Sequence, residues 1–457
     1  MRLKIQHSKN YFQMKTITKT AKSLLLASIA IGATVSFSSC DRKGCMDENA
    51  SNYEENATKE DPDEACEYDD ESITGEISAS TTWISEKVYT IDGKVVVPDG
   101  VTLTIEPGTI IKGKQGQEAA ASALVVARGG KIMAEGTAEA PIIFTSELDN
   151  IEPGQLVGTN LSKTDNELWG GVVICGKAKV STENGDTEGN IEGINPDDNF
   201  GKYGGSDDAD NSGVLSYVSI RHGGISIGEG NELNGLTLGG VGTGTEISNV
   251  EVYATLDDGI ECFGGSVNID NALVFYQGDD GIDLDQNYSG TISNFAVIHG
   301  DGIGTDEGLE IDGPEGSTHV DGKFTLTNGV CISEGTEDGS AGDFKSKAQG
   351  TITNVTFDYA SLGGKPVKIR SKYDDDCADK SDAFTNLVNG DLVFTNSKFS
   401  SIKVYDGDET DEGEVACPDE LDANNTRAAD FMTSGAGGSV NLQSVFGWTA
   451  AGQNSEL

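Results

Sequence analysis

Three short acidic boxes recur in the middle of the chain and carry the residues best suited to chemistry. They are Asp257-Asp258-Gly-Ile-Glu261, Asp279-Asp280-Gly-Ile-Asp283 and Asp306-Glu307-Gly-Leu-Glu310. Grouped carboxylates can act as general acid and base, or can supply the oxygen ligands that Ca²⁺ prefers. The plainer interpretation is a solvated acidic face on which the Asp-Gly pairs only form turns.

Short strands in a repeat must position these boxes. Runs of β-branched and aromatic residues recur between Gly, Asn and Asp, and there is no helical period of useful length. One asparagine stands between two such runs in each repeat, with spacings of 22, 23, 34, 26 and 42 residues. This spacing predicts a solenoid in which the asparagines adopt left-handed backbone and form an amide ladder. The asparagines are Asn249, Asn271, Asn294, Asn328, Asn354 and Asn396.

Stacking of the repeats would bring the acidic boxes together. The first two boxes begin eight residues after their asparagine, so they are expected to stack directly, whereas the third begins twelve after Asn294. Its register is therefore open, and Asp301-Gly-Ile is an alternative match. Like charges about 5 Å apart repel by roughly 3 kcal/mol at an effective dielectric near 20. Raised pKa values or a bound Ca²⁺ would relieve this repulsion, so the nine acidic residues of the boxes are the predicted metal ligands.

The first part of the chain carries a motif with a family resemblance. Val95-Val-Val-Pro-Asp-Gly-Val-Thr-Leu-Thr-Ile-Glu-Pro-Gly-Thr-Ile-Ile111 resembles the opening of a large group of bacterial secreted parallel β-helix proteins. The resemblance extends over about residues 84–450. It implies an all-β, right-handed parallel β-helix over 74–457 and no settled activity. The strands nearest the N-terminus are expected to cover one end of the stack, and Val440–Thr449 the other. An antiparallel sandwich or propeller is disfavoured, because tight hairpin turns are lacking.

A second resemblance concerns catalysis. Polygalacturonase-type β-helix hydrolases are similar in the order of an acidic pair, a His-Gly and a basic strand. If the chain is an enzyme, this resemblance assigns catalysis to Asp279, Asp280, His299 and Arg370, with paired carboxylates flanking a glycosidic bond. The chain departs from the pattern, because Arg370 lies 71 residues after His299 and Gly281 stands where that family has cysteine.

The N-terminus reads as a targeting signal. Residues 1–39 are predicted to be a secretory signal peptide, with the true start possible at Met14 and an apolar run from Leu24 to Val35. Small residues before Cys40 resemble the lipobox of bacterial lipoproteins of the Bacteroidetes type. The resemblance implies a lipid anchor on Cys40 that attaches the protein to the outer membrane, facing the periplasm or the cell surface. An ordinary cleaved signal that leaves Cys40 free is the alternative.

Seven further cysteines suit an oxidising compartment. Cys45 and Cys66 bound a small acidic segment within residues 40–73 that resembles short modules of Bacteroidetes surface proteins, and a disulfide is expected there. Cys377 and Cys417 lie in acidic loops and are the second expected pair. Cys175, Cys262 and Cys331 lie in apolar runs and are expected to be free and buried.

Composition limits the function. The chain has 31 Lys and Arg against 76 Asp and Glu, a net charge of −45, which excludes nucleic acid as a partner. We expect an anchored cell-envelope β-helix for binding, adhesion or scaffolding, with Ca²⁺ as a stabilising ion and a polysaccharide or cell-surface ligand as partner. The alternative is a polysaccharide hydrolase or lyase. The enzyme question stays open, with the non-enzymatic interpretation preferred.

Overall fold

The computed structural model describes residues 41–63, 65–117, 120–228, 231–300, 306–316, 319–333, 339–358, 365–406 and 417–457. The predicted signal peptide, the predicted anchor Cys40 and the alternative match at Asp301 lie outside these residues. The chain divides into two compact units. In the described residues, 41–48 and 52–66 form the first, and 49–51 with the chain from Glu67 onward form the second.

The first unit is a small segment closed by a disulfide. Cys45 and Cys66 are bonded, with Cα atoms 5.0 Å apart. Isolated parallel bridges pair Lys43 with Lys59 and Cys45 with Tyr53. The unit has hardly any apolar interior of its own, so the disulfide supplies the constraint that a core otherwise provides.

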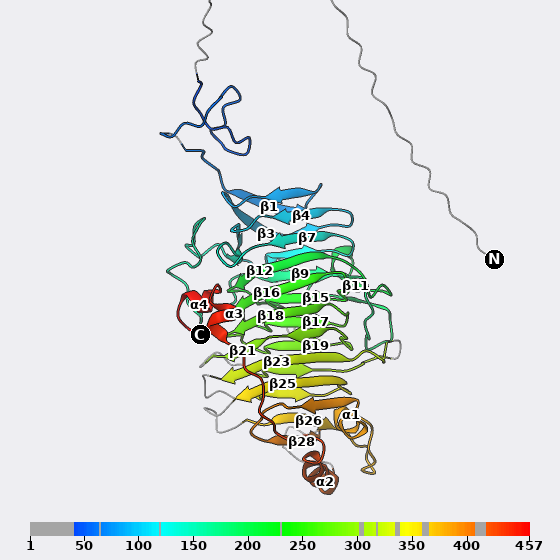
Figure 1. Cartoon of the computed structure of the whole chain (residues 1–457). Helices are drawn as coiled ribbons and strands as arrows, with labels where there is room; N and C mark the ends of the chain where they lie inside the picture. The colour runs from blue at the N-terminus through cyan, green and yellow to red at the C-terminus, as the bar shows by residue number, and fades with distance from the viewer. Residues whose placement is uncertain are drawn as a thin grey trace, which may run out of the picture. The chain divides into compact units, whose positions relative to one another are not determined.

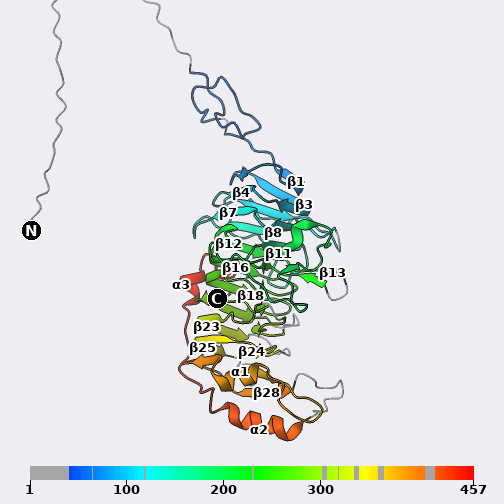
Figure 2. The same cartoon turned by 90° about the vertical axis from the view of Figure 1, so that its right-hand side faces the viewer.

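The second unit is a parallel β-helix, as predicted (Figures 1 and 2). Of the described strands, 24 form one rolled sheet with three stacks. Stack A contains β2 (Thr81–Trp83), β4 (Thr102–Ile105), β7 (Lys131–Glu135), β12 (Gly213–Arg221), β16 (Glu246–Tyr253), β18 (Asn268–Phe275), β20 (Thr291–Ser293), β23 (Phe324–Ser333), β25 (Gly350–Asp358) and β27 (Leu392–Thr395).

Stack B shares long strands with stack A. It contains β1 (Glu71–Glu76), β3 (Val88–Val97), β5 (Ile110–Gly113), β8 (Ile142–Ser146), the second halves of β12, β16 and β18, β21 (Ala296–His299), and the second halves of β23 and β25.

Stack C is built from separate strands. After the second half of β3 come β6 (Ala123–Val126), β9 (Gly171–Cys175), β15 (Leu236–Gly239), β17 (Ile260–Phe263), β19 (Ile282–Asp285), β22 (Leu309–Ile311), β24 (Gly342–Phe344), β26 (Val367–Ser371) and β28 (Ile402–Asp406). Antiparallel pairs β10 (Glu188–Asn190) with β11 (Lys202–Gly204), and β13 (Ile225–Gly228) with β14 (Asn231–Leu233), lie in insertions, with a 3-10 turn at Asn199–Gly201.

Alternation of side chains along each strand forms the core. In stack C, Ile260, Ile282 and Leu309 are paired and fully buried, and they belong to one apolar cluster inside the helix. The next residue of each strand points to the opposite face, which places Glu261 and Asp283 outside. The three free cysteines, Cys175, Cys262 and Cys331, are buried as predicted.

The predicted left-handed asparagines are confirmed, and the predicted amide ladder is confirmed in part. All six asparagines have positive φ, between 50° and 58°, at the bend between stacks A and B. Asn271 Nδ2 donates to Asn249 Oδ1 at 3.1 Å, and Asn396 Nδ2 donates to Asn354 Oδ1 at 2.7 Å. Asn294 departs from the pattern, because its Nδ2 donates to Asp270.

The prediction that Val440–Thr449 covers the end of the stack is wrong. Two other helices cover that end: α1 (Ala383–Asn389) contacts β26 and β27, and α2 (Pro418–Ala428) contacts β28. Asn425 of α2 both accepts from the Val404 N–H and donates to its carbonyl, so the backbone groups of Val404 on the last strand are satisfied. The second predicted disulfide, Cys377–Cys417, tethers α2 to the chain before α1.

The Val440–Thr449 segment covers the outer side of stack B instead. It contains α3 (Leu442–Phe446) and leads into α4 (Ala450–Gln453), and both lie beside β16 and β18 (Figure 1). The reason is an apolar outer surface there. Tyr253, Phe275 and Ile298 form one buried cluster with Phe446 and Ala450.

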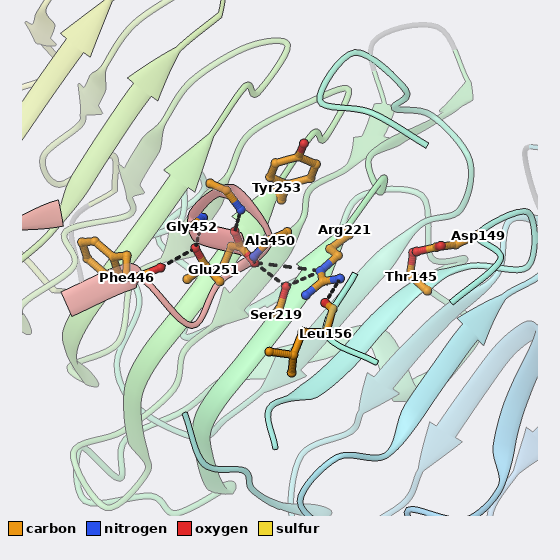
Figure 3. Close-up of polar contacts among 12 residues, drawn as sticks. Thr145, Asp149, Leu156, Ser219, Arg221, Glu251, Tyr253, Phe446, Ala450 and Gly452 are labelled. Atoms are coloured by element: carbon orange, nitrogen blue, oxygen red, sulfur yellow. Dashed lines mark hydrogen bonds and ion pairs between the residues drawn. The ribbon is translucent and has the colours of Figure 1, made fainter. Parts of the chain in front are cut away.

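One buried carboxylate fixes α4 (Figure 3). Glu251 is fully buried, and its oxygens accept from the backbone N–H groups of Ala450 (2.8 Å) and Ala451 (3.0 Å). Arg221 Nε lies 3.9 Å from Glu251 Oε2, and Ser219 Oγ bonds to both side chains. Glu251 therefore compensates a buried guanidinium and two helix N–H groups together.

Replacing Glu251 should release this contact. The Glu251→Ala substitution leaves Arg221 as an uncompensated buried charge, so we expect a loss of about 3–5 kcal/mol in unfolding free energy. Guanidinium titration followed by circular dichroism measures it. Glu246→Ala, on the exposed start of the same strand, is the matched control. Equal losses in the two variants would contradict the role given to Glu251.

Candidate functional site

The acidic boxes lie where each rung enters stack C. Glu261 pairs with Asp283 across β17 and β19, and Asp283 pairs with Glu310 across β19 and β22. The third box is thus in register with the first two. The spacing from Asn294 therefore did not fix the register of this box.

The glycines of the first two boxes are required by packing. A Cβ on Gly259 would lie 2.2 Å from Val274 Cγ1, and one on Gly281 would lie 2.3 Å from Val297 Cγ1. These approaches are far below van der Waals contact. Packing therefore explains why a glycine follows these aspartates, whether or not the aspartates also have a chemical role.

The second acid of each box also bonds along the stack. Asp258 Oδ1 accepts from the Asp280 N–H at 2.9 Å, and Asp280 Oδ1 accepts from the Glu307 N–H at 2.6 Å. Glu307 Oε1 accepts from Ser340 Oγ at 3.0 Å. Each carboxylate is held rigidly by these bonds while retaining further acceptor sites.

The carboxylates form three clusters, each with one oxygen per residue within 4.8 Å of the others. The clusters are Asp257, Asp258 and Asp279; Asp258, Glu261 and Asp283; and Asp280, Glu307 and Glu310. Eight of the nine predicted ligands are thus brought together. Asp306 belongs to none of the three and is exposed.

The third cluster differs from the other two because two lysines form ion pairs with it. Lys345 pairs with Glu310, and Lys368 Nζ lies 2.5 Å from Glu307 and 3.1 Å from Asp343. These contacts raise the pKa of both lysines against the effect of burial. The third cluster therefore has ion-pair partners already. Within the described part of the chain, no ion pair involves the carboxylates of the first two clusters, and Lys345 acts on Asp279 and Asp283 only through its charge.

The acidic groove has a volume of about 350 Å³. Seven carboxylates line it together with Asn234 and Phe263: Glu192, Glu232, Asp257, Asp258, Glu261, Asp279 and Asp285. Among the residues that the structure describes there, none of the lining side chains is basic. Two buried oxygens nearby, Asp283 Oδ1 and Asn234 Oδ1, have no hydrogen-bond partner. Unpaired buried oxygens among carboxylates are a suitable environment for a hard cation.

Burial and mutual repulsion raise the pKa values of the groove. Burial, then the charges of Glu232 and Asp279, raise the pKa of Asp257 to about 8. Burial, then the charges of Glu310 and Glu307, raise the pKa of Asp279 to about 6. The pKa values of Asp258, Glu261 and Asp283 are raised well above the usual range, first by burial. The ion-free groove therefore holds protons near neutral pH.

The two remaining catalytic candidates are not at the groove. His299 ends β21 in stack B, is 1% exposed, and burial lowers its pKa to about 4. Arg370 lies in β26, three rungs after β19, roughly 14 Å along the stack at 4.8 Å per rung. It pairs with Asp382 at 2.7 Å. The insertions between the boxes and Arg370 move it away from Asp279 and Asp280.

Several groove residues are absent from the predicted site. Asn234-Gly-Leu-Thr occupies the rung before Asp258-Gly-Ile-Glu in the same register, so the box pattern could have found Asn234. Asp285 lies on the same strand as Asp283, and the alternation of side chains puts both on the same face, so Asp285 could also have been predicted. Glu232 comes from β14 and Glu192 from the insertion after β10, and no period predicts the position of either.

Stability should fall with rising pH when cations are absent. The groove carboxyls have raised pKa values in the folded state and titrate near pH 4 in the unfolded chain, so the native state holds more protons between these limits. With EDTA present, we expect the unfolding free energy to decrease from pH 5 to pH 8 by an amount on the order of 1–3 kcal/mol. Urea titrations at each pH measure it. The Asp257→Asn, Asp279→Asn double variant should show a shallower decrease, and stability that rises across this range would contradict the pKa directions.

Among the described residues, the helices are all too short or too polar to cross a bilayer. No curated protein and no solved structure matches the chain. A family model described as a pectate-lyase like beta helix domain matches residues 75–451, nearly the whole second unit. The chain is a member of the pectate-lyase-like β-helix family.

Proposed function

We propose that the protein is a lipid-anchored β-helix of the cell envelope whose acidic groove binds divalent cations of the Ca²⁺ class. One observation carries the proposal. Asp258, Glu261 and Asp283 present oxygens within 4.8 Å of one another, and Asp283 Oδ1 is buried without a partner. Oxygen ligands of this kind suit Ca²⁺, and the ion replaces the protons that the groove otherwise holds.

In this proposal the bound cation supports the binding of a ligand and not a catalytic step. The repeats give an extended surface of the kind that solenoids use for polymers. A groove this acidic repels an anionic polysaccharide unless a bound cation reverses the local charge. Glycan binding or adhesion therefore requires bound calcium in this proposal. The anchor on Cys40 and the outer-membrane location are part of the same proposal and rest on the sequence alone.

Calcium should stabilise the protein, because it binds the folded groove and not the unfolded chain. At a concentration one hundred times the dissociation constant, the gain is about 2.7 kcal/mol, which raises the melting temperature by a few degrees. Differential scanning calorimetry in CaCl₂ and in EDTA at equal ionic strength measures it. Asp283→Asn should abolish the shift. The control is Asp343→Asn, an equally buried acid of the same row that is paired with Lys368. An unchanged melting temperature would falsify the calcium site.

A second candidate function is polysaccharide cleavage, favoured by the raised pKa values of Asp257 and Asp279. A carboxyl that keeps its proton near neutral pH can act as a general acid. The arrangement lacks His299 and Arg370, which the hydrolase resemblance requires, so we rank it second.

Cleavage and binding can be separated in one assay. We expect acidic polysaccharides to bind in Ca²⁺, to be released by EDTA, and to remain uncleaved, as judged by reducing-end formation and co-sedimentation. If products do appear and are lost in both Asp257→Asn and Asp279→Asn, the hydrolase or lyase interpretation replaces the binding one.

A further inference from the structure

The acidic groove contains two overlapping sets of oxygens rather than one. Asp258 belongs both to the set with Asp257 and Asp279 and to the set with Glu261 and Asp283. The carboxylates of Asp257, Asp279, Glu261 and Asp283 are thus grouped around that of Asp258. A carboxylate has two oxygens and about four lone-pair positions, so it can bind two ions at once.

Asp258 is fixed in the shared position. Its Oδ1 accepts the Asp280 N–H at 2.9 Å, and it is 7% exposed. It follows a bend that leads directly into β17, whose register is set by β15 on one side and β19 on the other. The rung-to-rung bond therefore holds Asp258 between the two sets and leaves its other acceptor positions available.

The two sets differ in their access to solvent. The inner set is buried throughout, with Asp258, Glu261 and Asp283 at 7%, 8% and 7% exposure. The outer set is open, because Asp257 is half-buried and Asp279 is exposed. An ion in the inner set would be enclosed by protein oxygens, and an ion in the outer set would keep bound water.

An unpartnered oxygen indicates a ligand at the inner set. Asp283 Oδ1 is buried without a hydrogen bond, in a side chain that is 7% exposed. Asn234, one rung before Asp258, donates from its Nδ2 to Glu261 and so holds that carboxylate in the set. A buried oxygen that has no donor can be satisfied by a cation instead.

Charge favours two ions over one. One divalent ion compensates two of the seven carboxylates that line the groove, and two ions compensate four. The third cluster differs, because Lys345 and Lys368 already compensate Glu310 and Glu307. We propose that the groove binds two divalent cations bridged by Asp258, an enclosed ion at Glu261 and Asp283 and an exchangeable ion at Asp257 and Asp279. This proposal rests on the proposed cation-binding function.

Calcium stoichiometry tests the proposal. The probe is Ca²⁺ alone, added to the purified, chelator-stripped full chain and measured by isothermal titration calorimetry and equilibrium dialysis. We expect two ions per chain. Asp283→Asn and Asp279→Asn should each leave one, and Asp258→Asn should weaken both by at least tenfold. Asp343→Asn should leave both unchanged. Glu310→Gln in the third cluster should still leave two ions per chain, although it removes a charge that acts on Asp279.

Terbium luminescence distinguishes the two ions. With Tb³⁺ in place of Ca²⁺, decay rates in H₂O and D₂O report the water bound to each ion. We expect a poorly hydrated ion that is lost in Asp283→Asn and a well-hydrated ion that is lost in Asp279→Asn. Each Asn variant reduces the repulsion among the groove carboxylates. We therefore expect the variants to fold at least as well as the parent in EDTA, and circular dichroism checks this.

The contrary outcomes are separate. One ion per chain, lost equally in all three groove variants, overturns the bridged pair and leaves the proposed function standing. Two ions with the second lost in Glu310→Gln place it in the third cluster and also overturn the pair. Absence of any bound calcium overturns the proposed function, and this inference with it.

Discussion

The rest of the structure depends on the parallel stacking of rungs at about 4.8 Å. Each position lies beside its equivalents in the neighbouring rungs, so a residue type repeated in the sequence becomes a row in space. An amide can donate and accept, so the row of asparagines stabilises itself, as in the Asn271–Asn249 bond. A carboxylate can only accept, so the row of Asp258, Asp280 and Glu307 needs donors from elsewhere. One geometric rule thus produces both a cohesive row and a repulsive one.

The chain relieves the repulsive row differently along its length. Backbone N–H groups bond to Asp258 and Asp280, which compensates part of each charge. A second acidic row, on the outer face of stack C, runs from Glu261 through Asp283 and Glu310 to Asp343. This row changes from acid to base further along, because Asp343 pairs in register with Lys368 and Lys368 with Lys403. The early rungs have no such lysines, and the insertions add Glu192 and Glu232 to the same groove. Uncompensated charge is therefore concentrated at one place, which is why the candidate site is there.

The sequence could predict what the repeat determines and little else. A period near 22 residues with a corner asparagine was enough to predict a solenoid and the stacking of the first two boxes. The family resemblance identified the solenoid as a parallel β-helix, and the apolar runs predicted the buried cysteines. The groove walls were not predictable, since Glu232 and Glu192 lie on insertions that follow no period. Lys345 stands in Gly-Asp-Phe-Lys345 without an acidic box to mark it. Val440–Thr449 was assigned to the wrong surface, because its apolar residues indicate burial but not the partner. The partner could have been recognised in Tyr253, Phe275 and Ile298, which make the outer side of stack B apolar.

The contact between Glu251 and Ala450 joins residues 199 positions apart. Stacked repeats otherwise interact only with their neighbours, so a solenoid can lose its terminal rungs one at a time. Here the end of the chain returns past the strands from β18 to β28 and is fastened to β16. The last rungs cannot separate from the middle without breaking that attachment. A one-dimensional stack thereby acquires a long-range closure. Its second half is expected to unfold as one cooperative unit, and a chain that lacks its final residues would lack this cooperativity even with every rung present.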